Sequence, residues 1–196
     1  MKVYGSSQSG NCLKVKWAAD ALGIGFDWVE TDSFSGATRT PEFLAINPAG
    51  QVPVVVVGDG RVLAQSNAIM LYLAEGSPLV PSDAYERAKM FEWLFWEQYS
   101  HEPAIAVRIA QLFYLKTPLE ELDPALLKKG HAALARMEQQ LQQSAFLVGG
   151  VFSLADIALV AYTRVAHRGG FDLARYAHVR AWIARVESRL SLSSAE

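Results

Sequence analysis

The stretch that most constrains the fold of this chain is residues 47–73, NPAGQVPVVVVGDGRVLAQSNAIMLYL. Its apolar run at 54–57 predicts a strand. The Gly-Asp-Gly sequence at 58–60 supplies the positive backbone angles of a tight turn, and residues 61–64 return as a second strand. A helix should follow, with Gln65 or Ser66 near its N-cap. The stretch therefore predicts a hairpin that leads directly into a helix.

Two features of this stretch indicate a binding site. Pro53 stands at the start of the first strand, where a missing N–H is tolerated, and an X-Pro bond can be cis where the chain turns sharply. A cis Val52-Pro53 bond would turn the backbone of Val52 outward, toward an extended peptide. The open helix N-terminus at Ser66 favours a carboxylate. Together they suit a small acidic peptide, and a plain hairpin packed on a helix is the alternative.

Composition limits the class of protein. The 196 residues are 51% hydrophobic, enough for one large domain or two small ones. Residues 1–75 hold five Lys/Arg and seven Asp/Glu, and the rest hold 13 of each, so a nucleic-acid partner is not expected. We expect no signal peptide, because residues 1–5 pass directly into a predicted strand and turn, and no apolar run reaches membrane length. The single cysteine, Cys12, excludes an internal disulfide and fits a reducing cytoplasm.

Four further elements precede the hairpin. They are a strand at 2–4, a helix with apolar positions from Val15 to Leu22, an alternating strand at 24–28, and a short helix at 41–46 that begins with proline. The order is β-α-β-α-β-β-α. Because crossovers are right-handed, the first two strands should be parallel neighbours, and the hairpin completes a small mixed sheet. This order is that of the thioredoxin-like fold, which has a cis-proline at the start of its third strand.

The loop before the first helix carries the frame Ser9-Gly10-Asn11-Cys12. Redox proteins of this fold have Cys-x-x-Cys here, with the first cysteine as the nucleophile. A hydroxyl replaces that cysteine, and Cys12 lies one turn further on, where it should face the core. Such a site cannot cycle its own disulfide, but it can position a thiol that a ligand brings.

The second half of the chain predicts helices only. Residues 77–82 form a proline-bounded linker, and the all-helical domain spans 83–196. Pro103 should kink or end the first long helix. Ala84, Ala88, Phe91 and Phe95 form an apolar face on that helix, which indicates core packing and a subunit interface or the wall of an apolar pocket. Later helix signals are Asp123-Pro124, the Ser153-x-x-Asp156 capping box before an apolar helix, and the apolar positions Val179, Trp182, Ile183, Val186 and Leu190.

The chain resembles the cytosolic glutathione S-transferases, specifically the serine-type members of the bacterial theta, nu and delta kind. The matching segments are Ser9-x-x-Cys12, Asn47-Pro48-x-Gly50-Gln51-Val52-Pro53 and Gln65-Ser66-Asn67-Ala68-Ile69, and the match continues through the second half. The resemblance implies a thioredoxin-like glutathione-binding domain at 1–76 followed by an all-helical domain that lines the electrophile site. It also implies glutathione as co-substrate, no metal, and a cytoplasmic homodimer that acts in detoxification.

The resemblance assigns a role to each residue of the glutathione site. Ser9 matches the hydroxyl that activates the thiol, and Asn11 could orient it or donate a second hydrogen bond. The cysteinyl and γ-glutamyl units would lie on Val52-Pro53 and on the pair Gln65-Ser66. The glycine carboxylate would lie near Gln51, with Arg39 or Thr38. Many members have Glu in place of Gln65, so the contact with the ligand amine should be weaker here.

The bend at Pro103 brings four further candidates to an electrophile site: Tyr99, His101, Ile105 and Arg108. Two of them have structural alternatives. His101 would be a hydrogen-bonded structural residue, and Arg108 would either be an exposed charge or attract an anionic co-substrate.

The free energy that Ser9 must supply to activate the thiol is small. The pKa of a free thiol is about 8.5, and it must fall by about two units for the thiol to be mostly ionised at neutral pH. Such a shift requires roughly 2.7 kcal/mol of stabilisation of the thiolate relative to the thiol. One hydrogen bond to a charged group supplies about 1.5–3 kcal/mol, and a helix N-terminus adds up to about 1 kcal/mol. A plain N-cap is the alternative role for Ser9. For Cys12 the alternatives are a buried structural residue and a mixed-disulfide partner.

The expected function is transfer of glutathione to a small apolar electrophile. A glutathione-dependent disulfide or peroxide reductase and a non-catalytic glutathione-binding scaffold are the two alternatives. Nothing in the sequence identifies the electrophile.

Overall fold

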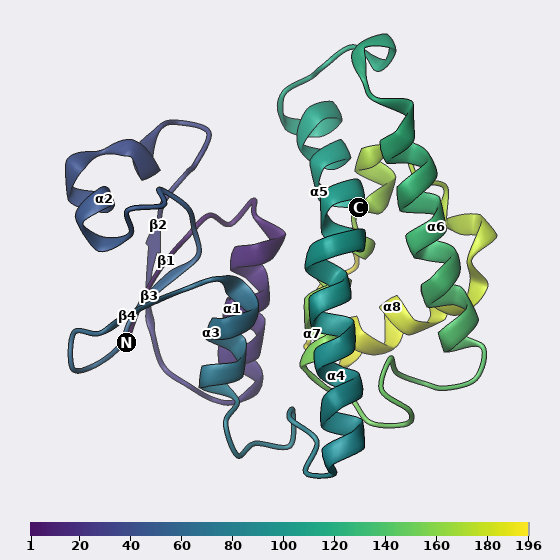
Figure 1. The fold of residues 1–196 in the computed structure, drawn as a ribbon, viewed down its shortest axis with the longest axis horizontal. Helices are drawn as coiled ribbons and strands as arrows, with labels where there is room; N and C mark the ends of the chain where they lie inside the picture. The colour runs from purple at the N-terminus through teal and green to yellow at the C-terminus, as the bar shows by residue number, and fades with distance from the viewer. Residues whose placement is uncertain (196) are drawn as a thin grey trace. The chain divides into compact units, whose positions relative to one another are not determined.

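A computed structural model describes residues 1–195 of the chain. The internal contacts divide the chain into two compact units, Met1–Ser77 and Pro78–Glu196. The first unit contains a small sheet with helices, and the second contains helices as its regular elements (Figure 1). Among the described residues, no helix combines the length and the apolar character needed to cross a bilayer.

The predicted element order of the first unit is confirmed. Its elements are β1 (Lys2–Gly5), α1 (Gly10–Ala21), β2 (Asp27–Glu30), α2 (Pro41–Ile46), β3 (Val54–Val56), β4 (Val62–Ala64) and α3 (Ser66–Leu73). The sheet order is β2-β1-β3-β4, with β1 parallel to β2 and antiparallel to β3. This is the mixed sheet of the thioredoxin-like fold.

The second strand begins later than its alternating sequence predicts. The pattern starts at Ile24, but the ladder starts at the pair Lys2↔Asp27. The N–H of Asp27 also donates to the carbonyl of Met1 (2.9 Å). Residues 24–26 therefore lie outside the ladder with β1, and pairing between strands sets the start of β2 more narrowly than the alternating pattern does.

The core of the first unit lies between the sheet and two helices. Helices α1 and α3 run side by side on one face of the sheet, and α2 lies on the other (Figure 1). The fully buried apolar side chains of this core include Val3, Val54, Val15, Ala18 and Ile69. The loops that carry the residues of the candidate site follow β1, precede β3 and follow β4.

The helical unit contains five α-helices among the described residues. They are α4 (Ala84–Trp96), α5 (Glu102–Ile109), α6 (Pro124–Leu141), α7 (Leu154–Thr163) and α8 (Ala177–Arg189). The prediction that Pro103 kinks or ends the first long helix agrees with a break in the α-helix, because α4 ends at Trp96 and α5 begins at Glu102. A π-helical turn, Glu97–His101, joins α4 to α5, and proline occupies the first turn of α5, where its missing N–H costs little.

The predicted capping box is confirmed, and both of its residues, Ser153 and Asp156, are buried in the helical unit. Asp156 is fully buried, and it accepts hydrogen bonds from the backbone N–H of Ser153 (3.0 Å), the backbone N–H of Leu147 (3.0 Å) and Nε1 of Trp182 (2.8 Å). Burial raises the pKa of Asp156 to about 6, and these hydrogen bonds oppose the rise. One carboxylate thus joins the start of α7 to a loop and to α8.

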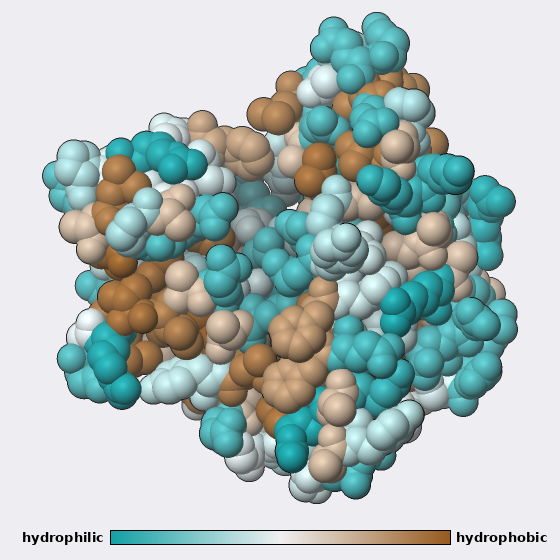
Figure 2. Space-filling model, viewed as in Figure 1, coloured by the Kyte–Doolittle hydropathy of each residue, from teal (hydrophilic) through white to brown (hydrophobic). Residues whose placement is uncertain are grey.

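The apolar face predicted for the first long helix is not its buried face. Met90, Trp93 and Leu94 are buried, whereas Phe95 is 72% exposed and its ring stacks on that of Phe91 at 6.2 Å. Apolar side chains accordingly reach the surface along α4 (Figure 2). Helical spacing alone does not distinguish the two neighbouring apolar faces, and the face that carries Trp93 packs inward.

Candidate functional site

Strand register brings three loops of the first unit to one end of the sheet. Tyr4 pairs with Val54, and Val54 pairs with Ala64. The end of β1, the start of β3 and the end of β4 are therefore neighbours. The segments that continue from these points carry Ser9, Val52-Pro53 and Ser66. The sheet thus brings together the loops that carry the thiol activator, the peptide-pairing residue and the carboxylate seat predicted from the sequence.

The predicted cis bond between Val52 and Pro53 is present. Asn47 holds the preceding loop, because its Nδ2 donates to the carbonyl of Gln51 (2.8 Å) and its Oδ1 accepts from the N–H of Ala49 (3.3 Å). Within residues 1–195, neither the N–H nor the C=O of Val52 has a hydrogen-bond partner. A half-buried residue with an unpaired backbone is suited to bind an extended peptide.

Ser9 is the N-cap of α1, and its Oγ accepts from the N–H of Cys12 at 3.4 Å. Cys12 is fully buried, as predicted. Burial raises the pKa of the Cys12 thiol, and a hydrogen bond from the Ser9 hydroxyl opposes the rise. Capping uses a lone pair of Ser9, whereas stabilising a thiolate uses its hydrogen. The cap therefore leaves this hydrogen available, but to reach a ligand thiolate it must turn away from the Cys12 sulfur.

Asn11 links α1 to α3. Its Oδ1 accepts hydrogen bonds from Nζ of Lys14 (2.8 Å) and from Oγ of Ser66 (3.2 Å). The sequence placed Asn11 beside Ser9. The structure adds a contact with Ser66, 55 positions away, which local sequence patterns do not reveal.

Gln65 and Ser66 lie where β4 passes into α3. Gln65 is the N-cap residue, with φ 71° and ψ 115°, an unusual backbone conformation for a residue with a side chain. Such a conformation costs about 1–3 kcal/mol and is concentrated at functional sites. The Gln65 side chain is exposed and makes no cap hydrogen bond, whereas Ser66 is buried. The side chain of Gln65 therefore accepts no hydrogen bond from the first backbone N–H groups of α3.

The predicted glycine-carboxylate residues lie around Gly50. Gly50 has φ 61°, and a Cβ there would overlap the guanidinium group of Arg39 and lie 3.1 Å from the carbonyl of Thr38. Arg39 is thus packed against the residue that precedes Gln51, and Gln51 is exposed. Thr38 is buried, so of the two alternatives Arg39 is better placed to meet a ligand.

The four residues predicted for the electrophile site have different environments in the helical unit. Tyr99 is 87% exposed, whereas His101 and Ile105 are fully buried. The Nε2 of His101 lies 2.9 Å from Oγ1 of Thr163. Arg108 donates from Nε to the carbonyl of Gly169 (2.7 Å) and is only 4% exposed, and burial lowers its pKa. The structural alternative is thus favoured for His101, and the alternative that Arg108 is an exposed charge is wrong.

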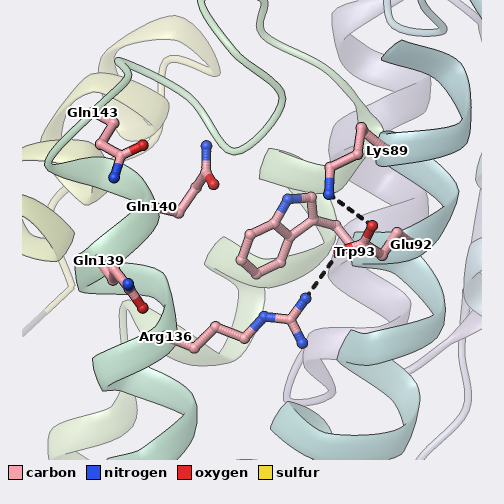
Figure 3. Close-up of a pocket in the computed structure, with 7 residues that line it drawn as sticks. All are labelled: Lys89, Glu92, Trp93, Arg136, Gln139, Gln140 and Gln143. Atoms are coloured by element: carbon pink, nitrogen blue, oxygen red, sulfur yellow. Dashed lines mark hydrogen bonds and ion pairs between the residues drawn. The ribbon is translucent and has the colours of Figure 1, made fainter. Parts of the chain in front are cut away.

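A cavity of about 270 Å³ lies between α4 and α6, and none of these four residues lines it. Figure 3 shows Trp93 facing Arg136 across it, with Glu92 bonded to Lys89 (2.7 Å) and to Arg136 (3.1 Å). Gln139, Gln140 and Gln143 complete the lining. No sequence motif marks this cavity, because its lining comes from two helices far apart in the chain. Its polar lining differs from the apolar pocket expected for an electrophile.

The described residues contain no cluster of three or more His, Cys, Asp or Glu side chains able to hold a metal ion.

Comparison with known proteins places both units in one family. Residues 8–75 match the family model "Glutathione S-transferase, N-terminal domain", and residues 97–189 match "Glutathione S-transferase, C-terminal domain". The chain is similar to a solved glutathione S-transferase from Pseudomonas fluorescens, with 47% identity and a TM-score of 0.92. That similarity covers 95% of this chain and 94% of the other.

Two curated relatives carry different names. Glutathione S-transferase 3 of Zea mays is 33% identical over 96% of this chain and 90% of its own length. The disulfide-bond oxidoreductase YfcG of Escherichia coli is 30% identical over 91% of this chain and 86% of its own length. The matches span both units, and the structure contains the family's sheet, cis-proline and helical unit. The chain is therefore an enzyme of the cytosolic glutathione S-transferase family.

Proposed function

We propose that the chain joins the thiolate of glutathione to a small apolar electrophile, with Ser9 as the thiol activator. The observation that supports this most directly is the convergence of Ser9, Val52 and Ser66 at one end of the sheet. In the proposed complex, the cysteinyl unit pairs with the backbone of Val52. The γ-glutamyl carboxylate lies at the N-terminus of α3, and the glycine carboxylate lies near Arg39 and Gln51.

In this reaction the protein ionises the thiol of glutathione and positions it beside the electrophile. The bound thiol releases its proton to solvent, and the Ser9 hydroxyl donates to the resulting thiolate. The sulfur then forms a bond to the electrophilic carbon, and the leaving group departs with the electron pair of the broken bond. Holding the two reactants together and stabilising the thiolate provide the rate enhancement.

Conjugation of glutathione to 1-chloro-2,4-dinitrobenzene tests this proposal. We expect product formation that saturates with glutathione, because the reaction passes through a bound thiolate. Boiled protein and glutathione alone serve as controls. Saturable glutathione binding without turnover of any aromatic halide, epoxide or enone would contradict the transferase proposal and support the scaffold alternative.

A reductase is the second candidate, and the Escherichia coli relative named as a disulfide-bond oxidoreductase favours it. Such a reaction would consume two glutathione molecules and one disulfide, and would yield oxidised glutathione and two thiols. Cys12 is buried and its thiol pKa is raised, so the attacking thiolate would again come from glutathione. The rate with 2-hydroxyethyl disulfide, measured beside the conjugation rate, distinguishes the two.

We also propose that the protein is a cytoplasmic homodimer that acts in detoxification. The exposed ring of Phe95, stacked on the half-buried ring of Phe91, supports an interface on α4, because adjoining apolar side chains at the surface can mark a site of protein association. Sedimentation equilibrium should give twice the chain mass, and Phe95→Glu should shift it toward one chain mass. A wild-type protein of one chain mass would contradict the dimer.

A further inference from the structure

A shallow hollow of about 510 Å³ opens on the surface of the helical unit, beside the C-terminal half of α8. Two arginines of that helix, Arg185 and Arg189, line it, and they are neighbours because residues four positions apart share a helix face. Phe146, from the segment between α6 and α7, contributes an aromatic ring. Ala184 and Ser188 complete the lining. The hollow therefore combines two guanidinium groups with an apolar wall.

The two arginines are held in place without a carboxylate. Nε of Arg185 donates to the carbonyl of Ala145 (3.2 Å), and the guanidinium group of Arg189 lies over the ring of Phe152, 5.2 Å from the ring centre. Within residues 1–195, neither side chain forms an ion pair, and the Nη groups of both have no hydrogen-bond acceptor. The outer N–H groups of the pair are therefore available to a ligand.

The elements that form the hollow offer no carboxylate to neutralise this pair. The segment 142–153 has no charged side chain, and Glu187, the one acid within α8, pairs with Arg164 at 2.8 Å. Like charges four positions apart on a helix repel each other and destabilise the helix. An anion in contact with both guanidinium groups would remove this repulsion.

A phosphate group fits this arrangement better than a carboxylate does. One guanidinium group occupies both oxygens of a carboxylate, whereas the three oxygens of a phosphate monoester can accept from two arginines at once. A phosphate monoester also carries nearly two negative charges at neutral pH, which matches the charge of the pair. The Ser188 hydroxyl has no hydrogen-bond partner in the described part of the chain, so it can donate to the third oxygen.

We propose that this hollow binds a small aromatic phosphate monoester. The phosphate lies between Arg185 and Arg189, and the aromatic group lies against Phe146 and Ala184. The hollow is larger than a phosphate ion, which leaves room for the aromatic group. Because the hollow is open to water and lies near the negative end of the α8 dipole, we expect a Kd in the high micromolar to millimolar range.

A site-resolved NMR titration of the whole chain with phenyl phosphate at low ionic strength tests the proposal, because backbone amide shifts report where the ligand binds. We expect saturable shifts at residues 145–147 and 184–190, separate from the amides of Ser9 and Val52 in the proposed glutathione site. Inorganic phosphate should bind about fivefold more weakly, because it lacks the ring. Phenyl sulfate has the same shape but one charge, so it should also bind about fivefold more weakly.

Matched variants separate this site from a general attraction of the protein for anions. Arg185→Gln and Arg189→Gln should each weaken binding about fivefold, the upper end of the range for an exposed ion pair. Arg180→Gln removes the same charge from an exposed position of α8 outside the hollow, and it should leave the affinity unchanged. Phe146→Leu should remove the preference for phenyl phosphate over inorganic phosphate. Because the three arginines are exposed, their variants should melt like the wild type.

Three results would each overturn the proposal. They are the absence of saturable shifts at residues 145–147 and 184–190, an equal loss of affinity in all three arginine variants, and equal affinity for phenyl sulfate and phenyl phosphate. Shifts confined to the proposed glutathione site would place the probe elsewhere and would overturn it as well.

Discussion

Replacing Ser9 by alanine should lower the conjugation rate at pH 7 by about three- to twenty-fivefold and leave most of the rate intact in alkaline solution. The Ser9 hydroxyl caps α1 through its oxygen, so its hydrogen can turn from the Cys12 sulfur to a bound thiolate. Loss of a hydrogen bond worth about 1.5–3 kcal/mol raises the thiol pKa by about one to two units. The thiolate fraction at pH 7 falls accordingly. The dependence of kcat/KM on pH is the measurement.

Two matched variants control this result. Ser9→Thr keeps both the cap and the hydroxyl and should retain the wild-type pH profile. Ser7→Ala removes a hydroxyl from the same loop, where it donates to Glu30 at 3.2 Å, and should change the profile little. The helix cap lost in Ser9→Ala costs about 1 kcal/mol of stability, which a melting curve monitors separately. An unshifted profile for Ser9→Ala would assign thiol activation to another donor, with Asn11 the first candidate.

Asp156→Ala should destabilise the helical unit by about 3 kcal/mol or more. The substitution leaves three buried N–H donors without their acceptor, from Leu147, Ser153 and Trp182. Each such orphan costs about 1–3 kcal/mol, partly offset because a buried charge is also removed. Urea unfolding followed by tryptophan fluorescence measures the effect. Asp172→Ala is the control, because Asp172 caps an exposed 3-10 turn and should cost about 1 kcal/mol or less.

The ionisation of Asp156 also predicts a pH dependence. Its pKa is about 6 in the folded protein against an ordinary 3.8, so between these values the folded state binds a proton that the unfolded state releases. The group's contribution to stability is therefore fully present below about pH 4 and is lost as the pH rises through 6. Two pKa units correspond to about 3 kcal/mol. Subtracting the curve of Asp156→Asn isolates this contribution, and a difference that stays flat from pH 4 to 7 would contradict the raised pKa.

Local sequence signals identified the fold because each one constrains the backbone directly. Pro53 has no N–H to donate, so it had to stand at the start of its strand, and the cis bond found there is the one the motif predicts. Ser153 and Asp156 lie three residues apart and cap each other without help from distant residues. Such signals depend on a few neighbouring residues, which is why they can be recognised in one sequence.

The burial of individual helical side chains could not be predicted from the sequence, because it depends on which side of each helix packs inward. Helical spacing gave α4 two apolar faces, and only packing decided that Trp93 is buried and Phe95 exposed. The burial of His101 and Arg108 depends on Thr163 and Gly169, which are more than fifty positions away in the chain. Lys14 is the clearest case, since a lysine on a helix is normally expected in water. Its burial follows from the packing of α1 and from the amide of Asn11.

The ultraviolet absorbance of the bound thiolate as a function of pH measures directly whether this site ionises the thiol of bound glutathione. We predict a thiol pKa well below the free value of about 8.5 in the wild type and a return toward that value in Ser9→Ala. A lowered pKa in both proteins would move the activating role to Asn11, the α1 N-terminus or a backbone N–H. Bound glutathione with an unshifted thiol pKa in the wild type would show that the site does not activate the thiol.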